Sequence, residues 1–419
     1  MRLTKNNVFN KIAVYGIGMG VVAFQLAGMI TGKDDLIKKD FALAENQYSR
    51  MLTVATDLTK FPRTTAPNGT LKYTSVKDWT GGFFPGGLWY LYEYTKDVKW
   101  KQAAEKWTEA LAKGQYNTVH HDVGFVMYCS YGNGYRLTKN PEYKKVLIQS
   151  AESLSSRFDP KVGSIKSWNS KASWDGKTTW HYPVIIDNMM NLELLFFASK
   201  VSGNPKYRNI AISHAKNAMR DHVRPDYSSY HVVNYDPETG KVLNRQTCQG
   251  FSDNSTWARG QAWGIYGFTM VYRETKDKRF LETARKMADF YLDNKNLPAD
   301  KVPYWDFNVN QPGYKPDWKY NASKFPVVPR DASAAAVVSS ALFEMSTYLG
   351  NGGKKYKQAA EKIVQSLSST DYLAKPGSNN NFILEHSVGS IPHGTEIDVP
   401  LIYADYYFLE ALLRYRKEG

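Results

Sequence analysis

The chain alternates between two kinds of segment, one apolar and rich in aromatic residues, the other polar and rich in Lys and Glu. Six apolar runs, each opening at a turn marked by Gly or Asp, cover residues 79–94, 120–137, 185–201, 258–275, 330–349 and 398–415. Six polar segments cover residues 39–57, 97–114, 140–158, 204–222, 277–294 and 353–370. A sixfold internal repeat of this kind determines the architecture before any single motif does.

Hydrophobic spacing predicts a helix for every segment. In one polar segment, Tyr356, Ala359 and Ile363 follow the spacing of an amphipathic helix, and residues 101–107 nearly repeat that sequence. The apolar runs, such as 400–409, are apolar around most of the helix circumference, which is typical of buried helices. We therefore expect an all-α fold, an (α/α)6 barrel of six inner and six outer helices, forming a single domain over residues 33–419.

Loop lengths place the long connections at one end of this barrel. Connections from inner to outer helices are short, whereas those from outer to inner helices are mostly long, at 58–78, 159–184, 223–257, 295–329 and 371–397. Long loops in compact domains are usually functional, so we expect the active face where the inner helices begin. Residues 230–235 and the turn 236–240 predict a β-hairpin over this face.

The first 32 residues differ from the repeat. Arg2, Lys5 and Lys11 precede an apolar run, 12–30, that contains no acidic residue. This is the pattern of a secretory signal peptide, and the run is long enough for an uncleaved membrane anchor. We expect an exported protein, located in a bacterial periplasm.

Composition excludes some partners. The net charge is +14, yet the basic residues are scattered and form no nucleic-acid-binding motif. Solvated helix faces or an anionic small substrate explain them, and we expect neither nucleic acid nor a stable protein partner. Cys129 and Cys248 could pair in an oxidising compartment, but two cysteines in a chain of this size make no disulfide framework, and the sequence leaves their pairing open. The eight His residues show no zinc-ligand spacing, so we expect no metal.

Two carboxylates stand at the starts of neighbouring inner helices, Asp122 and Asp187, and a barrel would bring them together. Either residue could be a simple helix N-cap. The apolar approach 183–186 favours desolvation of Asp187, which raises the pKa of a carboxyl, as does a second carboxylate nearby. A helix N-terminus opposes this by favouring the anion. A carboxylic acid that keeps its proton near neutral pH is suited to general acid catalysis.

Other polar and aromatic residues gather at the same helix starts. Arg259 is either a buried structural partner or, between Trp257 and Trp263, a bidentate ligand for an anion. The indole faces suit sugar rings, although any single Trp could be plain core. His121 and His231 fit hydrogen bonding to a substrate better than metal binding.

At these residues the chain resembles glycoside hydrolase family 88, the unsaturated glucuronyl hydrolases. The resemblance covers essentially the whole mature chain, and its most specific pieces are residues 121–125, 185–191, 257–264 and 403–411. It implies an (α/α)6 barrel that needs no cofactor. It also implies release of the Δ4,5-unsaturated uronic acid from the non-reducing end of oligosaccharides made by polysaccharide lyases.

The resemblance implies residue roles as well. Asp187 would protonate C4 of the double bond and take a proton from the water that attacks C5, after which the hemiketal opens and the aglycone leaves. Asp122 would orient the ring and tune Asp187. The usual inference from carboxylate separation to stereochemistry does not apply to such a hydration. The binding positions of the family fall on Trp79, His121, Trp168, His231, Gln249, Trp257, Arg259 and Trp263.

One departure from the family concerns sulfate. Members that accept sulfated substrates carry Ser-x-x-Ser-x-Lys in the last long loop. This chain keeps Ser387 and Ser390 as candidate binding residues but has Pro392 in place of the Lys, and His393 or another base is the candidate substitute. The resemblance therefore leaves open the choice among chondroitin, hyaluronan and heparin fragments.

Three other hypotheses compete. The unsaturated rhamnogalacturonyl hydrolases of family 105 share the barrel and the paired Asp, but residues 121–122 and 187–191 match family 88 better. A non-catalytic sugar-binding barrel would keep the aromatic cleft without needing two carboxylates at adjacent helix starts. A helical-repeat scaffold predicts an open superhelix and leaves the one-sided long loops unexplained.

Overall fold

A computed structural model of the chain describes the backbone of residues 10–417 and the side chains of residues 32–417. The predicted export segment, residues 1–32, thus lies almost entirely outside the described side chains. Among the described residues, no helix is both long enough and apolar enough to cross a membrane.

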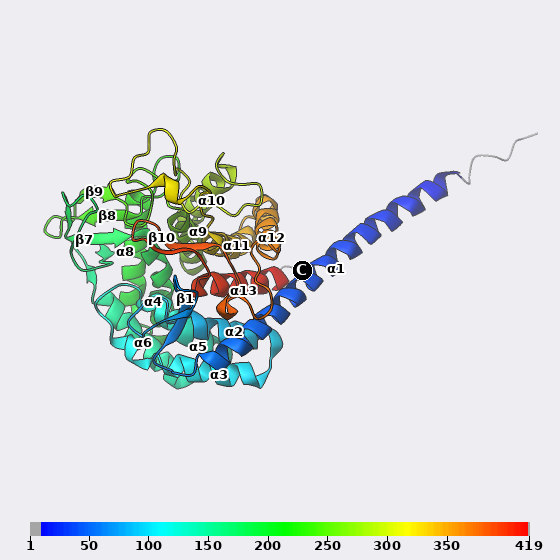
Figure 1. Ribbon diagram of the computed structural model, residues 1–419, viewed down its shortest axis with the longest axis horizontal. Helices are drawn as coiled ribbons and strands as arrows, with labels where there is room; N and C mark the ends of the chain where they lie inside the picture. Colours follow the sequence, from blue (N-terminus) through cyan, green and yellow to red (C-terminus); the bar gives the residue numbers. More distant parts are fainter. Residues whose placement is uncertain (1–9, 418–419) are drawn as a thin grey trace, which may run out of the picture.

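Six inner helical segments form a closed ring (Figure 1). They are α2 (Phe83–Thr95), the continuous α4 (Val123–Met127), π-helical turn (Tyr128–Gly132) and α5 (Asn133–Thr138), then α7 (Leu192–Ser202), α9 (Ala258–Thr275), α11 (Ala332–Ser346) and α13 (Ile402–Lys417). Each contacts the next in chain order, and α13 packs against α2 to complete the circle. The fold is the predicted (α/α)6 barrel.

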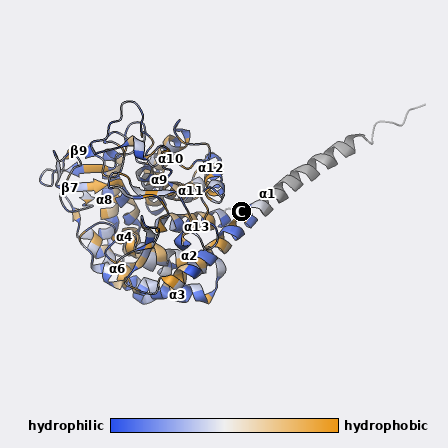
Figure 2. Ribbon diagram, in the orientation of Figure 1, coloured by the Kyte–Doolittle hydropathy of each residue, from blue (hydrophilic) through white to orange (hydrophobic). Residues whose placement is uncertain are grey.

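Five amphipathic helices and the part of α1 from residue 32 on surround this ring. They are α1 (Asn10–Val54), α3 (Val98–Glu109), α6 (Pro141–Ser155), α8 (Pro205–Asp221), α10 (Lys278–Asp293) and α12 (Lys354–Leu367). Figure 2 shows hydrophilic and hydrophobic residues alternating along helices such as α3. Four of them begin at a residue whose side chain accepts a hydrogen bond from the backbone N–H two residues on, which satisfies one of the free donors of the first turn. These caps are Asp97, Asn140, Asn204 and Asp277.

The long loops contain short strands, which the all-α description leaves out. The predicted hairpin is present as β8 (Val232–Tyr235) and β9 (Val242–Gln246), and β7 (Tyr182–Ile185) adds a third strand to it. Four further two-stranded pairs are β1 (Phe61–Thr65) with β2 (Leu71–Thr74), β3 (Phe158–Asp159) with β4 (Ser164–Ile165), β5 (Lys171–Ala172) with β6 (Thr179–Trp180), and β10 (Ser387–Ser390) with β11 (Thr395–Val399).

Two of the predicted inner helical runs open with strand instead of helix. The run 185–201 opens with the end of β7 and a 3₁₀ turn (Ile186–Asn191) before α7, and residue 398 belongs to β11 rather than to α13. The periodicity of a short apolar run does not distinguish a buried strand from a buried helix. The strand forms here because residues 182–185 pair antiparallel with β8.

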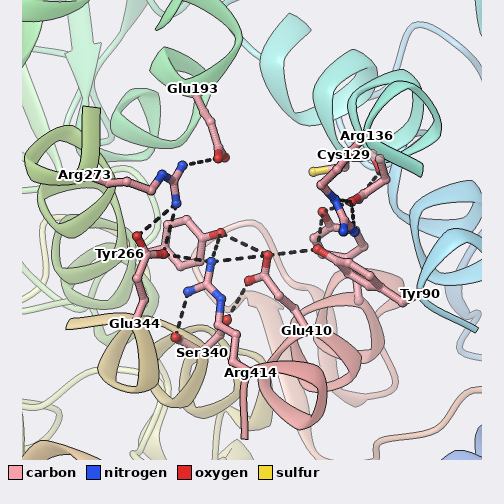
Figure 3. Close-up of polar contacts among 12 residues, drawn as sticks. Tyr90, Cys129, Arg136, Glu193, Tyr266, Arg273, Ser340, Glu344, Glu410 and Arg414 are labelled. Carbon is pink, nitrogen blue, oxygen red and sulfur yellow. Dashed lines mark hydrogen bonds and ion pairs between the residues drawn. The ribbon is translucent and has the colours of Figure 1, made fainter. Parts of the chain in front are cut away.

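A polar network fills the barrel axis near the C-terminal ends of the inner helices, at the end opposite the long loops (Figure 3). Arg273 contacts Glu193 and Glu344, whose carboxylate lies 3.0 Å away, and Arg414 lies 2.9 Å from the same Glu344. Glu410 accepts hydrogen bonds from the hydroxyl groups of Tyr90, Tyr266 and Ser340. Carboxylates thus compensate the charges of Arg273 and Arg414 inside this network, beside packed aromatic rings such as those of Tyr266 and Tyr407.

Candidate active site

A cleft opens at the long-loop end, where the inner helices begin. It is lined by Trp79, His121, Asp122, Phe125, Trp168, Ile185, Asp187, Gln249 and Arg259. The structure thereby brings seven of the predicted site residues to one cavity wall. Phe125 and Ile185 were not singled out as site residues, although both fall within the motifs that carry the family resemblance.

Asp122 immediately precedes α4, but its carboxylate does not cap that helix. Instead the carboxylate oxygens lie 3.3 Å from Nδ1 of His120 and 3.2 Å from Nε2 of His121. Burial alone would raise the pKa of Asp122, but the two neighbouring imidazoles, first the charge of His121, outweigh this effect and hold that pKa below its usual range. Asp122 is therefore the ionised carboxylate of the pair.

Asp187 lies in the 3₁₀ turn between β7 and α7, with its side chain 12% exposed. Burial is the main cause that raises its pKa to about 7, Arg259 opposes this, and the Asp122 carboxylate adds to it. Its Oδ2 is buried and forms no hydrogen bond with the described residues. Asp187 can consequently hold a proton near neutral pH and present it to the cleft.

His231 faces Asp187 from strand β8's N-terminal side. Its Nδ1 accepts hydrogen bonds from the backbone N–H groups of Cys248 and Gln249, at 3.0 and 3.1 Å. Nδ1 therefore carries no proton, and the neutral ring carries it on Nε2, 3.7 Å from Oδ2 of Asp187. Burial, followed by the charges of His222 and Lys171, lowers the pKa of His231 well below its usual value. The ring is a neutral donor beside Asp187.

The two segments that carry the carboxylates meet through backbone contact. The N–H of Phe125 donates to Oδ1 of Asn191 at 2.8 Å. A Cβ atom on Gly124 would lie only 2.5 Å from Cα of Asn191, so this close approach requires glycine. Gly124 thus fixes how near the start of α4 lies to the turn that holds Asp187.

Arg259 lines the cleft, but both of its terminal nitrogens are already engaged. Nη1 lies 2.9 Å from Oδ2 of Asp331, and Nη2 donates to the carbonyl of Gly389 at 2.6 Å. Its guanidinium stacks 4.5 Å from the Trp257 ring. This is the geometry of a buried structural partner, the alternative left open by the sequence, and only Nε lacks a hydrogen bond among the described residues.

The remaining predicted residues surround the cleft. Trp257 packs on His231 with 4.6 Å between ring centroids, and Trp263 is fully buried, with its ring 5.2 Å from that of the cleft residue Phe125. Ser387 is buried on β10, and Ser390 forms a 2.6 Å hydrogen bond with Nδ1 of His393 instead of facing free space.

Two participants were not identified as site residues from the sequence. Asp331, which pairs with Arg259, occupies the N-cap of the fifth inner helix and is equivalent to Asp122 in the repeat. Tyr403 packs 4.8 Å from the cleft residue Trp79. The repeat register could have pointed to Asp331, whereas Tyr403 lies in an apolar run that predicts only burial.

The described residues show neither a metal-binding cluster nor a disulfide. There, no group of three or more His, Cys, Asp or Glu side chains could hold a metal ion. Cys129 and Cys248 are both buried free thiols. The expectation that the protein needs neither metal nor cofactor remains a prediction.

An (α/α)6 barrel with one ionised and one protonatable carboxyl in an indole-lined cleft defines a carbohydrate-hydrolysing enzyme. Residues 54–411 match the model of Glycosyl Hydrolase Family 88, and the chain belongs to this family. It is thus a glycoside hydrolase.

Characterised relatives agree with this assignment. An unsaturated glucuronyl hydrolase of Formosa agariphila is 46% identical over 383 residues, which are 90% of each chain. An unsaturated chondroitin disaccharide hydrolase of Streptococcus agalactiae is 35% identical over 86% of each chain. A crystal structure of an unsaturated glucuronyl hydrolase specific for heparin superposes with a TM-score of 0.85 at 47% identity, covering 92% of this chain and 98% of that one.

Proposed function

We propose that this enzyme releases Δ4,5-unsaturated glucuronic acid from the non-reducing end of glycosaminoglycan oligosaccharides by hydrating the vinyl ether double bond. Asp187 donates its proton to C4 and accepts one from the water whose oxygen bonds to C5. The resulting hemiketal opens, and the remaining oligosaccharide leaves. The names of the relatives include both heparin and chondroitin, so family membership alone does not select the glycosaminoglycan.

The observation that carries this proposal is the state of Asp187. Its pKa of about 7 allows the carboxyl to be protonated when substrate arrives and ionised when water is activated. Asp122, whose pKa is lowered, stays anionic. Two carboxyl groups in one cleft thus have separate roles because their environments differ.

Unsatisfied polar atoms support a polyhydroxylated ligand. Buried polar groups normally have hydrogen-bond partners, so those without one need an explanation. Around this cleft, several such atoms find no partner among the described residues: Asp187 Oδ2, His231 Nε2, Arg259 Nε, Trp263 Nε1, Ser387 Oγ and Tyr403 Oη. Asp187 and Arg259 line the cleft directly, and hydroxyl and carboxylate groups of a bound uronate would satisfy their free atoms.

The test is the loss of the ultraviolet absorbance of the conjugated uronate, followed on unsaturated disaccharides from chondroitin, hyaluronan, heparin and rhamnogalacturonan. Asp187→Asn should lower turnover by about 100-fold or more while calorimetry still detects binding, and the surface variant Asp35→Asn should behave as wild type. Retained turnover in Asp187→Asn would refute the role of Asp187. Wild-type binding without product would favour the non-catalytic barrel, and turnover of the rhamnogalacturonan product alone would favour a family 105-like activity.

We also infer that the protein is exported. The support is the sequence of residues 1–32, with its basic start and apolar run. Cell fractionation with N-terminal sequencing of the recovered protein tests this. An uncleaved protein in the cytoplasm would contradict it.

A further inference from the structure

The rim of the cleft carries a cation that no acidic side chain neutralises. Lys171 is an exposed residue on β5, and among the described residues no carboxylate lies within ion-pair distance of its ammonium group. The acidic residue nearest in its hairpin, Asp175, pairs instead with Lys177 at 3.9 Å. The ammonium group of Lys171 is therefore available to an anionic ligand.

The position of Lys171 is defined by its contacts. Its Nζ lies 4.6 Å from the ring centroid of Trp168, which lines the cleft, and 5.5 Å from that of Trp180. Nζ is also 3.2 Å from Sγ of Cys248, the residue before the cleft-lining Gln249. Two indole faces and a thiol therefore hold this ammonium group against the cleft wall.

The hairpin that carries Lys171 is fixed to the rest of the rim. Lys171 pairs with Trp180 in the β5–β6 ladder. The indole N–H of Trp174 donates to the carbonyl of Cys248 at 2.9 Å, and the same ring packs 4.7 Å from His393. The ammonium group is thus placed on an anchored hairpin that joins two other loops of the mouth.

The last long loop offers no competing cation at this rim. Position 392 is Pro, and His393 shares a 2.6 Å hydrogen bond with Ser390. Burial, with a further contribution from the charge of Lys171, lowers the pKa of His393, so this imidazole is neutral near pH 7. The basic residue that replaces the Lys of the family motif is therefore not His393. Lys171 is the base that the structure offers instead.

We propose that Lys171 binds a sulfate group on the sugar attached to the unsaturated uronate, and so directs the enzyme toward sulfated oligosaccharides. This inference rests on the proposed function. The double bond of the uronate must lie at Asp187, which lines the cleft together with Trp168, whereas Lys171 does not line the cleft and contacts Trp168 from β5. The anionic group that meets Lys171 is therefore on the next sugar, where glycosaminoglycan hexosamines carry sulfate esters.

The experiment compares two unsaturated disaccharides that are identical except for one sulfate on the hexosamine. It measures the ratio of kcat/KM for the sulfated over the unsulfated substrate, with the sulfate placed at each hexosamine position in turn. Lys171→Gln should lower this ratio about tenfold for at least one position, because a hydrogen bond to a charged group is lost. Lys171→Arg should restore most of the ratio. Lys177→Gln, a change of the same kind in the same hairpin, should leave it unchanged.

Each outcome is informative. A fall in the ratio reversed by Arg supports the proposal, since a merely structural lysine would affect both substrates equally. An unchanged ratio in Lys171→Gln, or an equal loss on both substrates, overturns it. If the wild-type enzyme hydrolyses unsulfated disaccharides but shows no dependence on Lys171, only this inference fails. If it hydrolyses neither substrate, the proposed function itself fails.

Discussion

The Nε2 atom of His231 lies 3.7 Å from Oδ2 of Asp187, and two backbone N–H groups on the far side of the ring determine that this nitrogen carries the proton. Asp187 therefore faces a neutral donor rather than a cation. A neutral donor stabilises the carboxylate less than an imidazolium would, which is consistent with a pKa raised to about 7 by burial. The same contact supports the anionic form once the proton has been transferred.

The first prediction concerns pH. Because the protonated form of Asp187 is the donor and its pKa is about 7, kcat/KM should be level below that pH and fall about tenfold per pH unit above it. Asp122 has a lowered pKa and stays ionised across this range, so it causes no loss on the acid side near neutrality. The measurement is kcat/KM on one unsaturated disaccharide across pH 5 to 9.

The variant Asp122→Asn tests whether Asp187 is the group whose ionisation lowers kcat/KM as the pH rises. Asp122→Asn removes a carboxylate that raises the pKa of Asp187. The residual activity of this variant should therefore start to fall at lower pH than in the wild type. Asp187 is not the titrating group if kcat/KM rises through neutral pH. The same holds if kcat/KM of Asp122→Asn begins to fall at the same pH as that of the wild type.

The second prediction concerns the backbone contact between the two carboxylate segments. Gly124→Ala places a Cβ 2.5 Å from Cα of Asn191, so the start of α4 must shift away from the Asp187 turn. We expect kcat/KM to fall at least tenfold, since small displacements of catalytic groups are costly, and stability to fall by about 1–3 kcal/mol. Gly352→Ala is the matched control, because its Cβ would meet nothing within 4 Å. Wild-type kinetics in Gly124→Ala would contradict this account of the geometry.

Much of this site follows from the repeat. Asp122 and Asp187 could be placed in one cleft from the sequence because both stand where inner helices begin and the repeat makes those helices neighbours. The helix caps Asp97, Asn140 and Asp277 likewise mark the outer helices. Local chemistry and periodicity were sufficient for these features.

The parts that escaped prediction depend on long loops that have no periodicity. The neighbours of Arg259 leave open whether it binds substrate or is a structural partner; its terminal nitrogens contact Asp331 and the carbonyl of Gly389, 72 and 130 residues away, and its role as a substrate ligand stays a prediction. The tautomer of His231 is determined by the backbone at Cys248, which only the folded loop places there. The contact of Arg259 with Asp331 joins the starts of two inner helices, which the repeat register could have suggested. The contacts of Arg259 with Gly389 and of His231 with Cys248 involve long loops, for which sequence spacing carries no information.

The third prediction concerns the buried pair of Arg259 and Asp331, whose side chains are 1% and 0% exposed. Asp331→Asn leaves a buried guanidinium without its carboxylate and should destabilise the protein by about 3–5 kcal/mol. Because Arg259 also holds β10 through Gly389, KM should rise as well. Urea unfolding and steady-state kinetics measure the two effects.

The matched control for that pair is on the surface. Glu238→Gln removes the partner of Lys161, where both side chains are more than half exposed, and should cost at most about 1 kcal/mol. Equal losses in the two variants would mean that burial does not strengthen the dependence of Arg259 on Asp331.

The fourth prediction concerns the polar network at the other end of the barrel (Figure 3). Glu410 accepts hydrogen bonds from Tyr90 at 2.8 Å and Tyr266 at 3.1 Å, and it lies 3.5 Å from Arg414. Glu410→Gln removes a charge from a mutually neutralised, largely buried cluster and should cost about 3–5 kcal/mol. The kcat/KM per folded molecule should change less than twofold, because the cluster lies near the helix ends opposite the catalytic cleft.

The control is Lys417→Ala, which breaks a 3.1 Å pair between Glu93 and a lysine that is 67% exposed. It should cost at most about 1 kcal/mol. Loss of turnover in Glu410→Gln with unchanged stability would instead show that this end of the barrel takes part in the reaction.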